Sequence, residues 1–338
     1  MKVLMIFDIY DHVRNYTGVY HRIESTFNSA FENDPNYTYK AIYIGNEPGF
    51  INTPKQLNDA LLNEDYDIAV VSEGGDMVVD LQVAKKIGKK LFIMHWEGWS
   101  GVSNNPLTNF LTIYKKPRIW GGGAINQPAS IYEFSQYCNV LCYDYGYGEI
   151  FPNIYAVWAP YNSKLYKIDE SVERDIDVSH NGAVVTPERI RYVELFKRAN
   201  FPINYTGSQQ KHIFPFQALL EEDYVKIYQR AKISLCFNDC IFGPTASVRK
   251  QKIIESGLCG GFPIVTNPQT YTTFKGSWFK EGIHFISMNE SNCIDKIKYY
   301  LNHPDKRKEI SENLHKEINS YHTDKHWWNR LFEWAKDK

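Results

Sequence analysis

Basic side chains and one carboxylate lie together in the second half of the chain, between Arg249 and Thr266. This stretch predicts a helix that presents Arg249, Lys252 and Glu255 at its exposed end, followed by a glycine turn and a buried strand. A carboxylate can accept both hydroxyls of a ribose, and basic side chains neutralise phosphates. Cations beside a departing diphosphate stabilise the transition state more than the ground state. The stretch therefore predicts a site for the ribose and diphosphate of a nucleotide-sugar.

Two glycines in the same half follow strand-like runs. Gly182 comes after the run that starts at Ile176, with Asn181 beside it, and Gly207 closes the run Ile203–Tyr205. Glycine allows a backbone to come close to a ligand, so we expect Gly182 and Asn181 to lie against the phosphates. We place Gly207 in the same donor-binding set.

A histidine, a glutamate and two tryptophans follow the buried run Leu91–Met94 in the first half. A polar pair at the carboxyl end of a strand, flanked by aromatic faces that suit sugar stacking, predicts the acceptor cleft. If the reaction inverts the sugar, His95 or Glu97 could be the general base, because the surroundings can tune the pKa of either residue toward neutrality. Asp11, after the first strand, is a second candidate base. A core histidine with a satisfied hydrogen bond is the alternative for His95.

The candidate site residues lie in two series of alternating predicted strands and helices. Apolar strand-like runs alternate with amphipathic stretches from Val3 to Tyr143, and a second series follows a polar linker near residues 158–175. This alternation is typical of parallel sheets wrapped by helices, with ligands at the carboxyl ends of the strands. We expect an N-terminal lobe over 1–158, a C-terminal lobe over 159–321 and a final helix, 322–338, across the lobe junction or capping the second lobe.

Composition limits the classes of function. The chain has 338 residues with 43% apolar and 23% charged residues, and no apolar run approaches the roughly 18 residues of a membrane span. The formal net charge of −1 gives no general attraction to nucleic acid. The start, Met1–Asp8, predicts a strand and not a signal peptide, so we expect a cytoplasmic protein. The Cys-x-x-x-Cys pairs at Cys138 and Cys236 suit buried reduced thiols better than a metal site.

The second half resembles a known family. The stretch around Glu255, which ends in Cys259-Gly260-Gly261-Phe262-Pro263, is similar to the donor-binding motif of GT-B glycosyltransferases, particularly the CgeB-like, spore-maturation-type members of the group 1 clan. Further similarity lies in order along the chain, at Trp158–Pro160, Arg174–Gly182, Tyr205–Gly207 and Tyr228–Leu235. Ile254, Ser256 and Lys252 stand where the family usually has Phe, Ala and Arg.

The resemblance implies two Rossmann-like lobes that face each other across a cleft. The C-terminal lobe would bind the nucleotide-sugar, with Glu255 on the ribose and Lys252 or Arg249 on the diphosphate. The N-terminal lobe would hold an acceptor hydroxyl, and His95 resembles the histidine that many retaining members place against the transferred sugar. No cofactor is implied beyond the nucleotide-sugar, which is a co-substrate.

A metal site is not expected. Asp175-Ile176-Asp177 spells the Asp-x-Asp with which GT-A enzymes bind a divalent cation, but that motif ends a strand, whereas this one precedes its strand. A dinucleotide dehydrogenase is excluded because no Gly-x-Gly-x-x-Gly follows the first strand.

Several alternatives stay open. A two-lobed binding protein without turnover and a nucleotide-sugar epimerase are both compatible with the sequence. The acceptor could be a surface polysaccharide, a spore or capsule component, a protein side chain or a modified base in viral DNA. A glycan is favoured, and a nucleic-acid acceptor is not, because of the net charge.

Overall fold

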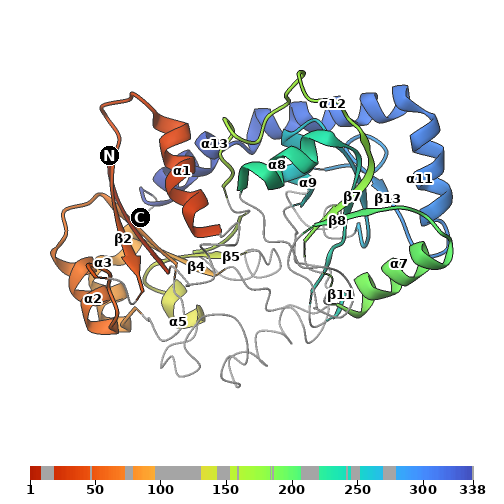
Figure 1. Cartoon of the computed structure of the whole chain (residues 1–338). Helices are drawn as coiled ribbons and strands as arrows, with labels where there is room; N and C mark the ends of the chain where they lie inside the picture. Colours follow the sequence, from red (N-terminus) through yellow and green to blue (C-terminus); the bar gives the residue numbers. More distant parts are fainter. Residues whose placement is uncertain are drawn as a thin grey trace. The chain divides into compact units, whose positions relative to one another are not determined.

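The chain folds into two compact units, shown in Figure 1. The computed structural model describes residues 1–8, 19–45, 48–72, 79–95, 131–142, 153–157, 160–182, 184, 186–206, 221–240, 243–244, 252–268 and 279–336. The first unit comprises the described residues up to Pro160 and from Asp324 onward, and the second comprises those from Tyr161 to Thr323. No helix in these ranges is long and apolar enough to span a membrane.

The first unit is built on a six-stranded sheet of order β2-β1-β3-β4-β5-β6, in which all neighbours are parallel. Alternate residues of β1 enter different cores: Leu4 and Ile6 join one, and Met5 and Phe7 join the other. Both faces are therefore covered, which explains the continuous apolar runs of these strands. The strands are β1 (Lys2–Asp8), β2 (Thr38–Ile44), β3 (Ile68–Ser72), β4 (Leu91–His95), β5 (Asn139–Cys142) and β6 (Ile154–Ala156).

Helices on each face bury these apolar residues. Thr53 caps α2 (Pro54–Asn63) with a capping box, and Asp80 caps α3 (Leu81–Ile87), which ends in the short turn η2 (Gly88–Lys90). Leu57 of α2 and Phe134 of α5 (Ile131–Ser135) lie in one core. The opposite core holds α1 (Val19–Phe31) and α13 (Asp324–Trp334), which contact each other.

The final helix, α13, belongs to the first unit. Trp328 is fully buried there and donates a hydrogen bond from Nε1 to Thr26 Oγ1 at 3.3 Å. Its ring meets Phe27 edge to face, with centroids 5.0 Å apart. Helix α13, near the end of the chain, thus shares a core with α1, near its start. Its expected place across the lobe junction stays a prediction.

The second unit is built on a five-stranded parallel sheet of order β13-β12-β9-β7-β8. The strands are β7 (Ile176–Asn181), β8 (Asn204–Thr206), β9 (Ala231–Cys236), β12 (Phe262–Val265) and β13 (Ile286–Ser287). A small antiparallel pair, β10 (Asp239–Cys240) and β11 (Gly243–Pro244), follows β9. Two parallel sheets with helices confirm the predicted α/β class.

Five described helices flank this second sheet (Figure 1). One core takes Tyr192 and Phe196 from α7 (Pro187–Arg198), with residues of α11 (Cys293–Asn302) and α12 (Pro304–Tyr321). The helices α8 (Glu221–Arg230) and α9 (Lys252–Leu258) contact β7, β9 and β12. These contacts fix the start of α9 relative to the end of β7, and the candidate site lies there.

Candidate functional site

The carboxyl edge of the second sheet, where its strands end, carries polar residues that are fully buried. His180 and Asn181, the last residues of β7, are 0% and 2% exposed. The His180 ring packs on Phe237 with centroids 4.7 Å apart, and its Nδ1 lies 3.0 Å from the carbonyl oxygen of Leu235. A carbonyl only accepts, so Nδ1 carries the proton. Nε2 of the neutral ring is then an acceptor, and it has no partner in the described part of the chain.

Charge as well as burial keeps His180 neutral. Burial lowers the pKa of His180 well below its ordinary value, and the nearby positive charges of Lys252 and Arg189 lower it further. His180 is therefore an uncharged hydrogen-bonding group beside cations.

Asn181 ties the ends of β7 and β8 together. Its Oδ1 accepts a hydrogen bond from Thr206 Oγ1 at 2.7 Å, and the Gly182 amide donates to the Thr206 carbonyl at 2.6 Å. Asn181 Nδ2 is buried and has no partner within the described ranges. The Asn181 side chain thus holds, at the end of β7, an N–H donor without an acceptor in the described part of the structure. Leaving a buried donor unpaired costs about 1–3 kcal/mol of folding free energy.

Lys252, the first residue of α9, reaches the same place. Its Nζ donates to the main-chain oxygen of Asn181. Gly182 has φ +138°, and a Cβ at this position would lie 2.5 Å from Nζ of Lys252. Only glycine fits both the backbone conformation and the close approach of the lysine. Gly182 thus lets the Lys252 side chain come close, and its predicted approach to phosphates stays a prediction.

Glu255 lies one turn further along α9 and is 4% exposed. Three tyrosine hydroxyls donate to its carboxylate. Tyr161 reaches Oε1 at 3.0 Å, Tyr224 reaches Oε2 at 3.2 Å, and Tyr228 also donates to Oε2. Burial, followed by the charge of Glu255, raises the pKa of Tyr228 well above its usual value, so this hydroxyl stays a donor. We call these three residues the tyrosine cage.

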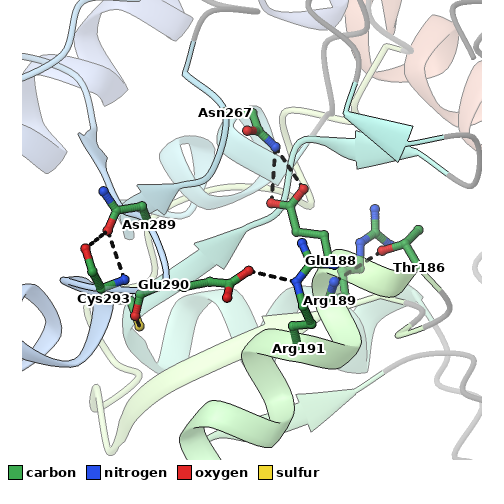
Figure 2. Close-up of polar contacts among 9 residues, drawn as sticks. Thr186, Glu188, Arg189, Arg191, Asn267, Asn289, Glu290 and Cys293 are labelled. Atoms are coloured by element: carbon green, nitrogen blue, oxygen red, sulfur yellow. Dashed lines mark hydrogen bonds and ion pairs between the residues drawn. The ribbon is translucent and has the colours of Figure 1, made fainter.

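Loops at the carboxyl edge are tied together near the start of α7, as Figure 2 shows. Thr186 caps the helix by accepting from the Arg189 amide, and Asn267, which follows β12, donates to both carboxylate oxygens of Glu188 at 3.1 and 2.9 Å. Arg191 donates to Glu290, which follows β13, at 2.8 Å. Hydrogen bonds thus hold the segments after β12 and β13 against the first two turns of α7.

Asp175 and Asp177 are held in ion pairs. Arg230 donates to both carboxylate oxygens of Asp175 at 2.7 and 2.5 Å, and these hydrogen bonds lower the Asp175 pKa. Lys232 donates to Asp177 at 2.6 Å. Both aspartates lie where β7 begins, at the edge opposite His180. Across the described ranges no group of three or more His, Cys, Asp or Glu could hold a metal ion. Cys138, Cys236, Cys259 and Cys293 are buried and free, as the sequence predicts.

The side chains of the remaining predicted site residues lie outside the described part of the structure. His95 is the last residue of β4 in the first unit, but its side chain lies outside the described part of the structure. Asp11, Glu97, Gly207 and Arg249 also lie outside the described residues. Their predicted roles stay predictions.

Sequence reasoning missed the tyrosine cage and His180. Tyr224 and Tyr228 are four residues apart on α8, a spacing that places both on one helix face and could have drawn attention to them. Tyr161 is 94 positions from Glu255, and no local signal links the two.

Comparison with known proteins identifies the fold, and one family model matches part of the chain. Residues 188–333 match the family model described as glycosyl transferase-like. An α-glucosyltransferase solved with UDP-glucose and DNA containing an abasic site superposes over 100% of both chains, with 10% identity and a TM-score of 0.60. The fold is that of the GT-B glycosyltransferases.

Two further structures share this fold. AviGT4, a glycosyltransferase involved in avilamycin A biosynthesis, covers 99% of this chain and 97% of its own, with 10% identity and a TM-score of 0.59. HepE of Anabaena, solved with UDP-glucose, covers 98% of both chains, with 9% identity and a TM-score of 0.57. A search of curated protein sequences gives no match.

Proposed function

We propose that this protein is a glycosyltransferase, a CgeB-like member of the GT-B group, that binds a nucleotide-sugar at the carboxyl edge of its second sheet. One observation carries the proposal: Lys252, the unmet donor of Asn181 and the buried carboxylate of Glu255 lie together at that edge. The GT-B fold and the family match over residues 188–333 support it.

The cations would bind the diphosphate. Lys252 and Arg249 would neutralise its charge, Asn181 Nδ2 would donate to a phosphate oxygen, and Gly182 and Gly207 would let the backbone approach. In the reaction the bond from the sugar C1 to the diphosphate breaks, and the bond from the acceptor oxygen to C1 forms. The diphosphate keeps the electron pair, and its growing negative charge is stabilised by the lysine already in place.

Glu255 would bind the ribose. Its carboxylate already accepts hydrogen bonds from hydroxyls, and the two ribose hydroxyls offer the same chemistry. We infer that the ribose replaces Tyr161 and Tyr224, whose hydrogen bonds are 3.0 and 3.2 Å long, while Tyr228 stays in place.

The acceptor would bind in the first unit, near the end of β4. His95 or Glu97, with Asp11 as a further candidate, would take the proton of the acceptor hydroxyl or contact the transferred sugar. Several structures of the same fold are solved with UDP or UDP-glucose, which makes a UDP-sugar the first donor to try. We propose a metal-independent, cytoplasmic enzyme without a cofactor and with a surface glycan as its favoured acceptor.

A modified DNA base is the second candidate acceptor, because the α-glucosyltransferase of the same fold is solved with DNA. The formal net charge of −1 speaks against it. The salt dependence of acceptor binding distinguishes the two candidates. Binding to DNA should weaken steeply between 50 and 200 mM salt, whereas binding to a neutral glycan should not.

Glu255→Ala is the direct test of the donor site, with Glu255→Gln as a variant of similar shape. We expect both to lose measurable affinity for UDP-hexoses by calorimetry, while Glu222→Ala, an exposed carboxylate on α8, binds as the wild type does. Circular dichroism would establish that each variant is folded. A folded Glu255→Gln with unchanged affinity for every nucleotide-sugar would remove Glu255 from the site.

A panel of nucleotide-sugars separates the classes of function. Release of UDP with transfer or hydrolysis of the sugar supports a glycosyltransferase. Inversion at C2 of the sugar would identify an epimerase, and tight binding of a free sugar without turnover would identify a binding protein.

A further inference from the structure

The second unit has a pocket at the amino edge of its sheet, where the strands begin. Its volume is about 590 Å³, within the range of small-molecule sites. Arg174 precedes β7, Lys232 is the second residue of β9, and Gly260 precedes β12. Residues of α12 from Pro304 to Lys316 form the other wall. The candidate donor site lies at the opposite edge of this sheet, so the pocket is a separate place.

Cations outnumber carboxylates in the lining of the pocket. Arg174, Lys232, Arg307, Lys308 and Lys316 face two carboxylates, Glu170 and Glu312. Lys232 is paired with Asp177 at 2.6 Å, and Lys308 lies 3.7 Å from Glu312. The two arginines and Lys316 remain in excess over Glu170.

Both arginines are fixed by main-chain carbonyls. One terminal nitrogen of Arg174 donates to the carbonyls of Tyr228 and Ala231, at 3.2 and 2.5 Å, and the other donates to Cys259 at 2.6 Å. Arg307 donates from one terminal nitrogen to the carbonyls of Tyr300 and Leu301. Each guanidinium has five N–H donors, so these contacts orient the group and leave further donors.

The charge of Arg307 acts on Arg174, and the charge of Asp177 acts on Arg307. Burial lowers the pKa of Arg174, and the positive charge of Arg307 lowers it further. Neither arginine forms an ion pair with a carboxylate among the described residues. Two oriented like charges with spare donors would be stabilised by an anion between them.

We propose that this pocket binds a ligand that carries two or more phosphoryl groups. Phosphoryl oxygens match the planar donor geometry of arginine, and a second phosphoryl group would use Lys316 on α12. Gly260 has φ +69°, and a Cβ there would lie 2.9 Å from Ile168 Cγ1 and 3.2 Å from Arg174 Nη2, so glycine leaves room for both side chains.

Titration calorimetry with inorganic pyrophosphate tests the proposal on the full chain, with UDP present in excess to fill the donor site. We expect the wild type to bind pyrophosphate and the double variant Arg307→Gln, Lys316→Gln to bind at least about tenfold more weakly. The matched control, Lys86→Gln with Lys298→Gln, removes two positive charges from exposed residues outside the pocket and should bind as the wild type does.

Each outcome of this experiment supports or overturns the proposed phosphoryl site. No binding of millimolar pyrophosphate to the wild type, or equal weakening in the control variant, would overturn the proposal. Loss of binding in Lys252→Gln instead would assign the pyrophosphate to the donor site. Vesicles containing a bisphosphorylated phosphoinositide distinguish the source: vesicle binding that depends on Arg307 and Lys316 indicates a lipid headgroup, and pyrophosphate binding alone indicates a soluble ligand.

Discussion

Glu255 illustrates how one buried charge is maintained in the second unit. A carboxylate that is 4% exposed is tolerated only when hydrogen bonds replace its hydration, and the tyrosine cage supplies them. The same cage covers the carboxylate, so the proposed binding of a ribose requires part of the cage to move.

Tyr228→Phe removes one donor to this charge without changing the packing. We expect the free energy of unfolding to fall by about 1.5–3 kcal/mol, the usual contribution of a hydrogen bond to a charged group. Urea denaturation measures this loss in the free energy of unfolding. Tyr192→Phe is the control, because Tyr192 is equally buried and no hydrogen bond of its hydroxyl is found in the described part of the chain. Equal losses in the two variants would show that Tyr228 does not support Glu255.

His180 predicts a pH dependence of stability. Its pKa is lowered in the folded state, so below pH about 6.5 the unfolded chain binds a proton that the folded chain does not. Stability is therefore lost as the pH falls, by up to about 1.4 kcal/mol per pH unit from this residue. His284 and His326, whose pKa values are also lowered by burial, act in the same direction.

His180→Asn isolates the contribution of this one residue, because the asparagine amide can still donate to the Leu235 carbonyl. Urea denaturation between pH 7 and pH 5 should show a shallower loss of stability in this variant than in the wild type. Parallel curves for the two proteins would mean that folding leaves the pKa of His180 unchanged.

At the scale of elements, α9 joins the candidate site to the rest of its unit. Gly257 on α9 packs directly on α12, where a Cβ would lie 2.4 Å from Ile318 Cδ1 and 2.7 Å from Leu314 Cγ. His315 Nδ1 of α12 lies 2.9 Å from the Gly257 carbonyl oxygen. The position of Lys252 and Glu255 thus depends on a close contact between α9 and α12.

Gly257→Val tests this contact. We expect a loss of about 1–3 kcal/mol in the free energy of unfolding, because the added carbons cannot fit between Ile318 and Leu314. The neighbouring Ser256→Ala is the control. Its hydroxyl is buried without a partner among the described residues, so its removal should leave stability unchanged or improve it. Thermal unfolding measures the stability of both variants. A Gly257→Val variant as stable as the wild type would show that α12 can move away from α9.

The sequence predicts these elements well where local signals exist. Pro187 and Pro304 mark the starts of α7 and α12, since proline suits the first turn of a helix. The buried runs of the parallel strands are equally clear. Contacts between distant residues are not predicted: Glu255 meets Tyr161 and Tyr224, which are 94 and 31 positions away, and nothing in their spacing indicates a shared carboxylate.

At the scale of the whole molecule, the charges of the second unit are divided between the two edges of its sheet. The carboxyl edge has Lys252 beside a neutral His180. At the amino edge Asp175 and Asp177 are paired with Arg230 and Lys232, and Arg174 and Arg307 line the pocket. The aspartates that spell the metal-binding motif are therefore paired with cations of the protein, at the edge opposite the candidate site.

This division predicts catalysis in which lysine, and not a divalent cation, stabilises the departing diphosphate. Sugar transfer from the preferred nucleotide-sugar should proceed unchanged in excess EDTA, and Lys252→Gln should lower kcat about 10²–10³-fold. Added Mn²⁺ should not rescue that variant, and Asp175→Asn should transfer sugar at the wild-type rate, since its partner is Arg230. A strict requirement for Mn²⁺, or a loss of transfer in Asp175→Asn comparable to that in Lys252→Gln, would contradict the assignment of charge stabilisation to the carboxyl edge.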